Sequence, residues 1–183
     1  SMLLPRIIPV LLIRNKGLVK TVNFNKFTYV GDPINAVRIF NEKKVDELIV
    51  IDIDASKENR EPDYNMIDAL ASECRMPLCY GGGIKNIEQV NRILALGVEK
   101  VALSSVAFED INLIKSIANE IGSQSVVVVM DVKKRKFSNK YDCYILNGKK
   151  NTKISPTDFA LQAILNGAGE LLINSIDNDG LMK

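Results

Sequence analysis

The run VDELIVIDID, residues 45–54, indicates a buried strand because β-branched and apolar residues follow one another with few interruptions. A similar run, GAGELLINSID, occupies residues 167–177. In the same way RIIPVLLIR, residues 6–14, can be laid over SVVVVMDVK, residues 125–133, four strand-helix units later. A half-barrel that is duplicated within a (β/α)8 fold has this spacing.

Short β-branched runs alternate along the chain with amphipathic segments. The runs are RIIPVLLI (6–13), ELIVIDID (47–54), PLCYGGG (77–83), KVALSS (100–105), SVVVVMDV (125–132) and ELLINSID (170–177). The amphipathic segments are Pro33 to Lys44, Tyr64 to Glu73, Ile87 to Leu96, Leu113 to Ile121 and Pro156 to Asn166. This alternation predicts six βα units and a parallel sheet that is buried on both faces.

The length of the chain sets a limit on this barrel. A complete (β/α)8 barrel takes about 200 to 250 residues, whereas the chain has 183 and its last predicted strand lies near the end. We therefore expect one α/β domain of the (β/α)8-barrel type over residues 1–183, with the last two βα units missing. The alternative is a smaller doubly wound sheet with both edges open.

Composition excludes several kinds of chemistry. The formal charge of +2 is made of 24 basic and 22 acidic residues, so we expect neither nucleic acid nor a membrane as partner. With no histidine, Ser-His-Asp and Cys-His catalysis are excluded, and we expect no metal site and no cofactor. Cys74, Cys79 and Cys143 lack metal-site spacing, which is typical of reduced residues in a cytoplasmic protein. The N-terminal apolar run is interrupted by Pro5 and Arg6, which argues against a signal peptide.

Every second side chain of a predicted strand should form a row that points into the barrel. In four of the strands the first residue of this row is charged. Because side chains alternate along a strand, Arg6, Glu47, Lys100 and Glu170 should converge at the amino-terminal mouth of the barrel. Buried charges persist only where they are paired. The cluster is either a structural plug of the barrel floor or a charged gate through which a small molecule enters.

The carboxyl ends of the strands are where barrel enzymes place their active sites. Gly81, Gly82 and Gly83 follow the third strand, and Ser104 and Ser105 follow the fourth and precede a helix. Backbone N–H groups at such positions bind anions, so these residues predict a phosphate site. The alternative is that the glycines only form a tight turn.

Carboxylates also follow the predicted strands. Asp131 ends the fifth strand, and an acid beside apolar walls can serve as general acid or base, so Asp131 is the first catalytic candidate. The internal overlay places Leu12 at the equivalent position in the first strand. Asp131 could instead pair with Lys133. Four more acids lie at strand ends: Asp52, Asp54, Asp177 and Asp179. Asp52 and Asp54 could instead cap loops.

Two longer connections should reach the same mouth. Residues Arg14 to Gly31, which include Lys20, are predicted to form a long loop of the kind that acts as a lid. Lys133 to Lys153 form a basic insert in which YILNGKKNT indicates a hairpin with an Asn-Gly turn. Its lysines form either a solvated face or a contact to a second anionic group.

These motifs together resemble the family of cyclase subunits of imidazole glycerol phosphate synthase. They are RIIPVLLI, GLVKT, VGDP, DELIVIDI, GGGI, GVEKVALSS, GSQSVVVVMDVK, GKKNT and GAGELLINSIDNDG, and they occur in this order along essentially the whole chain. The resemblance covers the first six of the eight βα units of that family. It implies a lyase that takes ammonia from a glutaminase subunit and acts on a phosphorylated nucleotide.

The resemblance also assigns roles to individual positions. Arg6, Glu47, Lys100 and Glu170 match the ammonia gate. The implied phosphate and substrate positions are Lys20, Asp52, Gly82, Gly83, Ser104, Ser105, Asn174 and Asp179, with Ser104-Ser105 in place of the usual Asn-Thr. Of the two aspartates that transfer protons in that family, Asp131 matches one and Leu12 replaces the other.

Leucine in the first strand is similar to a paralogous branch that occurs with surface-polysaccharide genes, in which barrel and glutaminase supply ammonia for amidinating a sugar. We therefore favour a paralogue with impaired cyclase chemistry over the authentic histidine-pathway cyclase, which forms imidazole glycerol phosphate and aminoimidazole carboxamide ribotide. Two further alternatives are a non-catalytic scaffold that activates a glutaminase and a sugar-phosphate isomerase on the same barrel.

Overall fold

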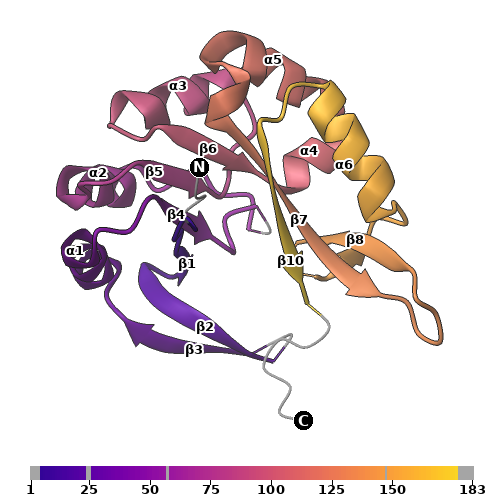
Figure 1. Ribbon diagram of the computed structural model, residues 1–183, viewed down its shortest axis with the longest axis horizontal. Coiled ribbons are helices and arrows are strands. Elements are labelled where there is room, and N and C mark those ends of the chain that lie inside the picture. The colour runs from indigo at the N-terminus through magenta and orange to yellow at the C-terminus, as the bar shows by residue number, and fades with distance from the viewer. Residues whose placement is uncertain (1–4, 24–25, 57, 147, 177–183) are drawn as a thin grey trace.

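Six parallel strands form the centre of the molecule (Figure 1). The computed structural model describes residues 5–23, 26–56, 58–146 and 148–176. The parallel strands are β1 (Val10–Arg14), β4 (Leu48–Asp52), β5 (Leu78–Gly81), β6 (Lys100–Leu103), β7 (Val126–Lys134) and β10 (Glu170–Ser175). Each of them pairs with the parallel strand that follows it in the chain, so their order is β1-β4-β5-β6-β7-β10.

This strictly sequential order is that of a βα-barrel. A doubly wound sheet reverses its strand order at a switch point, so the doubly wound alternative is wrong and the predicted fold class is confirmed. Among the described residues the sheet is not closed, because β1 and β10 do not pair with each other. The absence of two further βα units stays a prediction.

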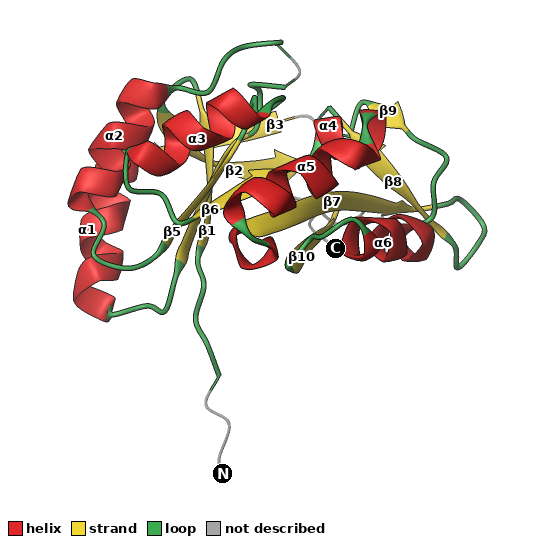
Figure 2. Ribbon diagram, turned by 90° about the horizontal axis from the view of Figure 1, so that it is seen from above, coloured by secondary structure: helices red, strands yellow, loops and turns green. Residues whose placement is uncertain are grey.

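The helices lie along the outer side of the curved sheet in both views (Figures 1 and 2). They are α1 (Pro33–Lys43), α2 (Tyr64–Glu73), α3 (Ile87–Ala95), α4 (Ser105–Glu109), α5 (Ile111–Ile121) and α6 (Pro156–Leu165), with one 3₁₀ turn at Ser123–Ser125. Side-chain caps fix where several of them begin: Asn86 Oδ1 accepts from Gln89 N at 2.9 Å, and Ser155 Oγ accepts from Asp158 N at 3.2 Å. The predicted helices have nearly these bounds, although α4 was not predicted as a separate helix.

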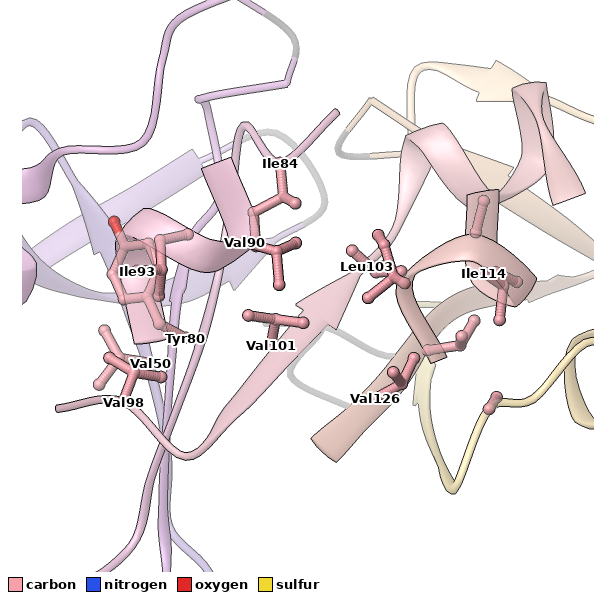
Figure 3. Close-up of a cluster of buried hydrophobic side chains, with 14 of the residues drawn as sticks. Val50, Tyr80, Ile84, Val90, Ile93, Val98, Val101, Leu103, Ile114 and Val126 are labelled. Carbon is pink, nitrogen blue, oxygen red and sulfur yellow. The ribbon is translucent and has the colours of Figure 1, made fainter. Parts of the chain in front are cut away.

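Alternation along the strands divides the apolar residues between two cores. The larger core fills the space between sheet and helices and includes Val50, Tyr80, Val101, Leu103 and Val126 (Figure 3). The smaller core lies on the other face of the same strands and consists of Ile49, Cys79, Ala102, Val127 and Val129, with Ile8, Ile51 and Leu172 packed against it. Apart from Cys79, these residues belong to the alternating rows that were predicted to point inward.

The predicted long loop from Arg14 to Gly31 is instead a β-hairpin, so that prediction is wrong. β2 (Gly17–Asn23) pairs antiparallel with β1 and with β3 (Lys26–Gly31). The turn between β1 and β2 contains Asn15 and Lys16 with φ of 51° and 64°, as a type I′ turn requires. Lys20 lies in β2 opposite Thr28, and its side chain lies outside the described part of the structure.

The basic insert forms the predicted hairpin. β8 (Tyr141–Ile145) pairs antiparallel with the end of β7 and with β9 (Lys150–Asn151). Asn147 of the predicted turn lies outside the described residues. Val132 pairs with both β8 and β10, so these two strands lie on opposite edges of β7. β6 pairs with the first residues of β7, and β8 pairs with the last residues of β7 along the same edge. None of the helices within the described ranges has the length and hydropathy to cross a membrane.

Candidate functional site

The four charged side chains at the amino ends of the strands form one chain of ion pairs. Arg6 Nη2 lies 3.4 Å from Glu47 Oε2, Lys100 Nζ lies 2.9 Å from Glu47 Oε1, and Lys100 also pairs with Glu170. The four residues come from the segment before β1, from the residue before β4, and from the first residues of β6 and β10. We call these four residues the floor cluster.

Burial differs across the floor cluster. The Glu47 side chain is 2% exposed, whereas that of Arg6 is 61% exposed, so the ion pairs run from solvent to the smaller core. Burial alone would lower the pKa of Lys100, but its hydrogen bonds to Glu170 and Glu47 outweigh this effect and raise that pKa above its ordinary value. Lys100 is therefore a cation at neutral pH, as the pairing requires.

Cys79 lies in the smaller core next to this cluster. Burial raises the pKa of its thiol, and the carboxylate of Glu47 raises it further. The thiol is thus held protonated and unreactive. All three cysteines are free, as the sequence predicts.

At the opposite, carboxyl ends of the strands, the glycines after β5 have a packing role. A Cβ at Gly82, where φ is +125°, would lie 2.6 Å from the carbonyl oxygen of Asp52. A Cβ at Gly83, where φ is +76°, would lie 2.5 Å from the carbonyl oxygen of Arg60. Close approach of the end of β4 and of the β4–α2 loop therefore accounts for both glycines.

Two acids, one at the end of β4 and one just after it, hold the same loop. Arg60 binds the buried carboxylate of Asp52 with Nη1 at 3.3 Å from Oδ2 and Nη2 at 3.4 Å from Oδ1. Asp54, which is also buried, pairs with Arg14 Nε at 2.8 Å. The structure thus gives both acids a role in stabilising the loop, whereas the resemblance assigns Asp52 to the substrate.

Ser104 connects β6 to the short helix α4 and makes no side-chain capping bond to it. The backbone of Ser105 begins α4, but its side chain is outside the part that the structure describes. Asp177 and Asp179 also lie beyond the described residues. The structure therefore does not place the complete set of predicted phosphate-binding side chains.

Asp131 and Asn174 are brought together at the ends of β7 and β10. They face each other in the register of the two strands, and Asn174 Nδ2 donates to Asp131 Oδ1 at 3.2 Å. Leu12 stands between its register partners Val19 and Ile51. The mouth is therefore polar at β7 and β10 and apolar at β1.

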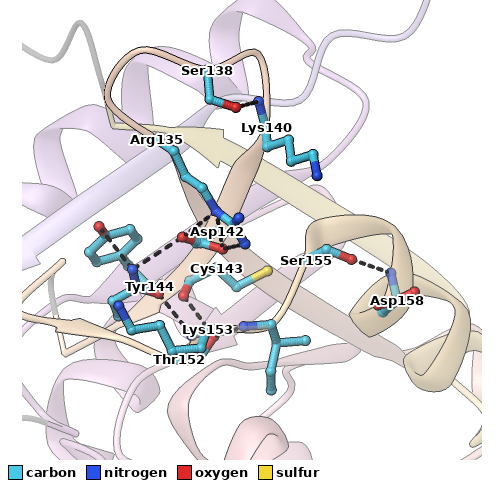
Figure 4. Close-up of polar contacts among 12 residues, drawn as sticks. Arg135, Ser138, Lys140, Asp142, Cys143, Tyr144, Thr152, Lys153, Ser155 and Asp158 are labelled. Carbon is cyan, nitrogen blue, oxygen red and sulfur yellow. Dashed lines mark hydrogen bonds and ion pairs between the residues drawn. The ribbon is translucent and has the colours of Figure 1, made fainter.

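A set of polar residues on the β7–β8–β9 hairpins was not predicted as part of the site (Figure 4). Arg135 clamps Asp142 through Nε at 3.0 Å from Oδ2 and Nη2 at 2.8 Å from Oδ1. Asn151 Nδ2 donates to Asp142 Oδ2 at 3.2 Å and to the Tyr144 hydroxyl at 3.3 Å. The guanidinium of Arg135 lowers the pKa of Asp142, although burial opposes this shift. The antiparallel registers of β7 with β8 and of β8 with β9 bring these residues together.

Within the described ranges, no three His, Cys, Asp or Glu side chains gather as a metal site would need.

Comparison with known proteins identifies the family. A family model described as histidine biosynthesis protein matches residues 6–183. The chain is 58% identical over 182 residues to a Vibrio vulnificus protein with the provisional name imidazole glycerol phosphate synthase subunit hisF3, covering all of this chain and 70% of that protein. It is 52% identical over 178 residues to a provisionally named hisF2 subunit of Pseudomonas aeruginosa, covering 97% of this chain and 70% of that protein.

A Lactococcus lactis protein named imidazole glycerol phosphate synthase subunit HisF is 44% identical over 179 residues, which are 98% of this chain and 69% of that protein. The sequential parallel sheet is the arrangement that this similarity requires. The chain belongs to the histidine biosynthesis protein family, on the branch of the cyclase subunits of imidazole glycerol phosphate synthase.

Proposed function

We propose that this protein is a divergent cyclase-type subunit that receives ammonia from a glutaminase partner at the amino ends of its strands and delivers it to a phosphorylated ligand at the carboxyl ends. The observation that carries the proposal is the floor cluster. Its pairs connect the exposed Arg6 to the buried Glu47, and Glu47 to the partly buried Lys100. Paired charges at a barrel floor can exclude bulk water and still part for a small neutral molecule such as ammonia.

We place the glutaminase against the amino-end face because the exposed end of the floor cluster lies there. The ligand is placed at the other face, where Gly82, Gly83, Ser104 and Ser105 follow β5 and β6. Lys20, Asn174 and Asp179 complete the proposed substrate site by family resemblance. This assignment supports a phosphorylated ligand but leaves its sugar and base open.

The proposed chemistry is an impaired cyclisation. Proton transfer between two acids needs a carboxyl group at both strand ends, and only Asp131 is present while Leu12 is apolar. We infer that the chain supports amidination of a surface-polysaccharide sugar in place of, or in addition to, imidazole formation. The numbered names hisF3 and hisF2 of two relatives support the proposal that this chain is a paralogue.

The test is ammonia-driven cyclisation of the ribulosyl aminoimidazole carboxamide nucleotide by the parent and by Leu12→Asp. A restored proton-transfer group should raise the rate by about 10²- to 10⁴-fold. Leu12→Asn is the matched control, since it is polar and similar in size but cannot ionise, and it should stay at the parent rate.

The opposite result identifies the authentic histidine-pathway cyclase, which the 44% identity to the Lactococcus lactis subunit favours as second candidate. In that case the parent turns over as fast as Leu12→Asp. This outcome would overturn the proposal of impaired chemistry.

A further inference from the structure

The hairpin between β7 and β8 ends in a segment that is both strongly basic and exposed. Residues 134–141, with the sequence KRKFSNKY, contain four basic residues and no acidic one. Every residue of this segment except Ser138 is exposed. The loop that joins the two strands projects beyond the sheet at the edge of the molecule in both views (Figures 1 and 2). We call residues 134–141 the basic tip.

The protein itself neutralises only part of this positive charge. Arg135 pairs with the buried Asp142, with Nη2 at 2.8 Å from Oδ1. Among the described residues, no acid pairs with Lys136 or Lys140. The formal charge of +2 is a balance over the whole chain and does not show this local excess. The expectation of no membrane partner depended on that balance, so the basic tip has to be considered separately.

Phe137 lies at the end of the basic tip and buries none of its ring. Its relative exposure is 106%, and its φ of 58° lies in the left-handed region, where an aromatic residue is uncommon. Two hydrogen bonds fix this turn: Arg135 N donates to Lys140 O at 2.8 Å, and Lys140 N donates to Ser138 Oγ at 3.0 Å (Figure 4). Packing within the described structure therefore does not explain an aromatic residue at this position.

A single exposed apolar side chain is common on protein surfaces, but its position among lysines points to a particular kind of surface. Lysines are attracted to the negative potential of anionic lipid headgroups, and amphipathic segments that lie at a membrane interface combine basic residues with apolar ones such as phenylalanine. The basic tip has both features. Within the described ranges no helix could cross a membrane, so such a contact would be peripheral.

Other partners fit the basic tip less well. A specific protein–protein interface takes about 20 to 30 residues from each partner, whereas the basic tip has eight. Single-stranded nucleic acid is bound by successive aromatic rings on which its bases stack, and Phe137 is the one ring of the basic tip that is fully exposed. A membrane surface needs neither a large complementary area nor a series of rings.

We propose that the basic tip attaches the protein reversibly to membranes that contain anionic lipids. Phe137 inserts between the headgroups, and Lys136 and Lys140 contact the lipid phosphates. One aromatic side chain and a few lysines give weak binding that salt reverses. This attachment is independent of the ammonia path and of the ligand at the carboxyl ends of the strands.

Sedimentation with vesicles tests the proposal. The parent should sediment with vesicles of phosphatidylcholine and phosphatidylglycerol in equal amounts, but not with phosphatidylcholine alone, and added salt should release it. Lys136→Gln combined with Lys140→Gln should lower the partition coefficient about 25-fold, because each basic residue near an anionic surface contributes a factor of about five. Phe137→Ser should lower it several-fold.

The matched controls place the same changes on the helices. Lys43→Gln combined with Lys115→Gln removes two exposed lysines from α1 and α5. Leu165→Ser removes an apolar side chain of α6 that is 70% exposed, so it tests whether any exposed apolar residue would serve. Both controls should bind anionic vesicles as the parent does. Far-UV circular dichroism should be the same for all variants, since surface substitutions change stability little.

Three results would overturn the proposal. They are a parent that does not sediment with anionic vesicles, a parent that sediments equally with neutral ones, and equal loss of binding in the tip variants and their controls. If the parent ignores vesicles but binds a single-stranded oligouridylate, and the tip variants do not, the basic tip is a nucleic-acid contact instead. None of these results changes the proposed function, because ammonia-driven turnover is measured without vesicles.

Discussion

Glu47 is the residue that links the floor cluster. It is 1% exposed and pairs with both Arg6 and Lys100. Glu47→Gln should lower the free energy of unfolding by about 2 kcal/mol, less than the roughly 3 to 5 kcal/mol of a fully isolated buried charge, because Lys100 keeps Glu170. Urea unfolding followed by circular dichroism measures this.

The control for this prediction is Glu42→Gln, the same change at an exposed position of α1. Surface substitutions of this kind change stability by about 0.5 kcal/mol at most. Equal midpoints for the two variants would show that Glu47 does not hold the cluster together.

Single residues were predictable from sequence where strand periodicity alone places them. Arg6, Glu47, Lys100 and Glu170 meet because each begins an inward row, and the period of two is a property of any strand. The partners of Asp52 and Asp142 were not predictable in this way. Arg60 comes from an irregular loop and Arg135 from a hairpin whose register depends on its turn.

At the level of elements, the Arg135–Asp142 ion pair joins the end of β7 to β8. Asp142 has a pKa below its ordinary value in the folded protein, so it stabilises the fold above about pH 4, where the carboxyl of the unfolded chain is ionised. This stabilisation is lost as the pH falls through the lower pKa of the folded state. Asp142→Asn should therefore lower the melting temperature at pH 7, and the difference from the parent should shrink toward pH 3.

Thermal unfolding of both proteins across this pH range measures the effect. Asp158→Asn, at an exposed position in the first turn of α6, is the control and should show a smaller difference at pH 7. A deficit of Asp142→Asn that persists unchanged at pH 3 would contradict the ion-pair explanation.

Elements were predicted well where periodicity and caps agree. The segment Tyr64 to Glu73 is α2 with the predicted bounds, and Asp63 Oδ1 caps it by accepting from Met66 N at 3.1 Å. The β2–β3 hairpin was missed because residues 14–31 were read as a single long loop. Asn15-Lys16-Gly17 was the available signal for the turn from β1 into β2, since asparagine accepts the positive φ of a tight β-turn and glycine often follows it.

For the whole molecule, internal similarity was the strongest predictor. The likeness of residues 45–54 to residues 167–177 places β4 and β10 in equivalent units, and the sheet orders its parallel strands sequentially between them. What the sequence could not predict is the path of β8 along the edge of β7 beyond β6. That path depends on where β6 ends. The packing of the whole sheet sets this end, and no local sequence pattern predicts it.

The measurement that tests the ammonia path most directly compares glutamine-driven with ammonium-driven product formation by the complex with its glutaminase, in the Leu12→Asp background. Lys100→Met removes the cation that joins Glu47 to Glu170. We predict that it lowers the glutamine-driven rate several-fold and leaves the ammonium-driven rate nearly unchanged, because free ammonia reaches the ligand from the open mouth. Passage of ammonia through the floor cluster would be contradicted if Lys100→Met lowered both rates equally. It would also be contradicted if the ratio of the glutamine-driven to the ammonium-driven rate were the same with and without Lys100→Met.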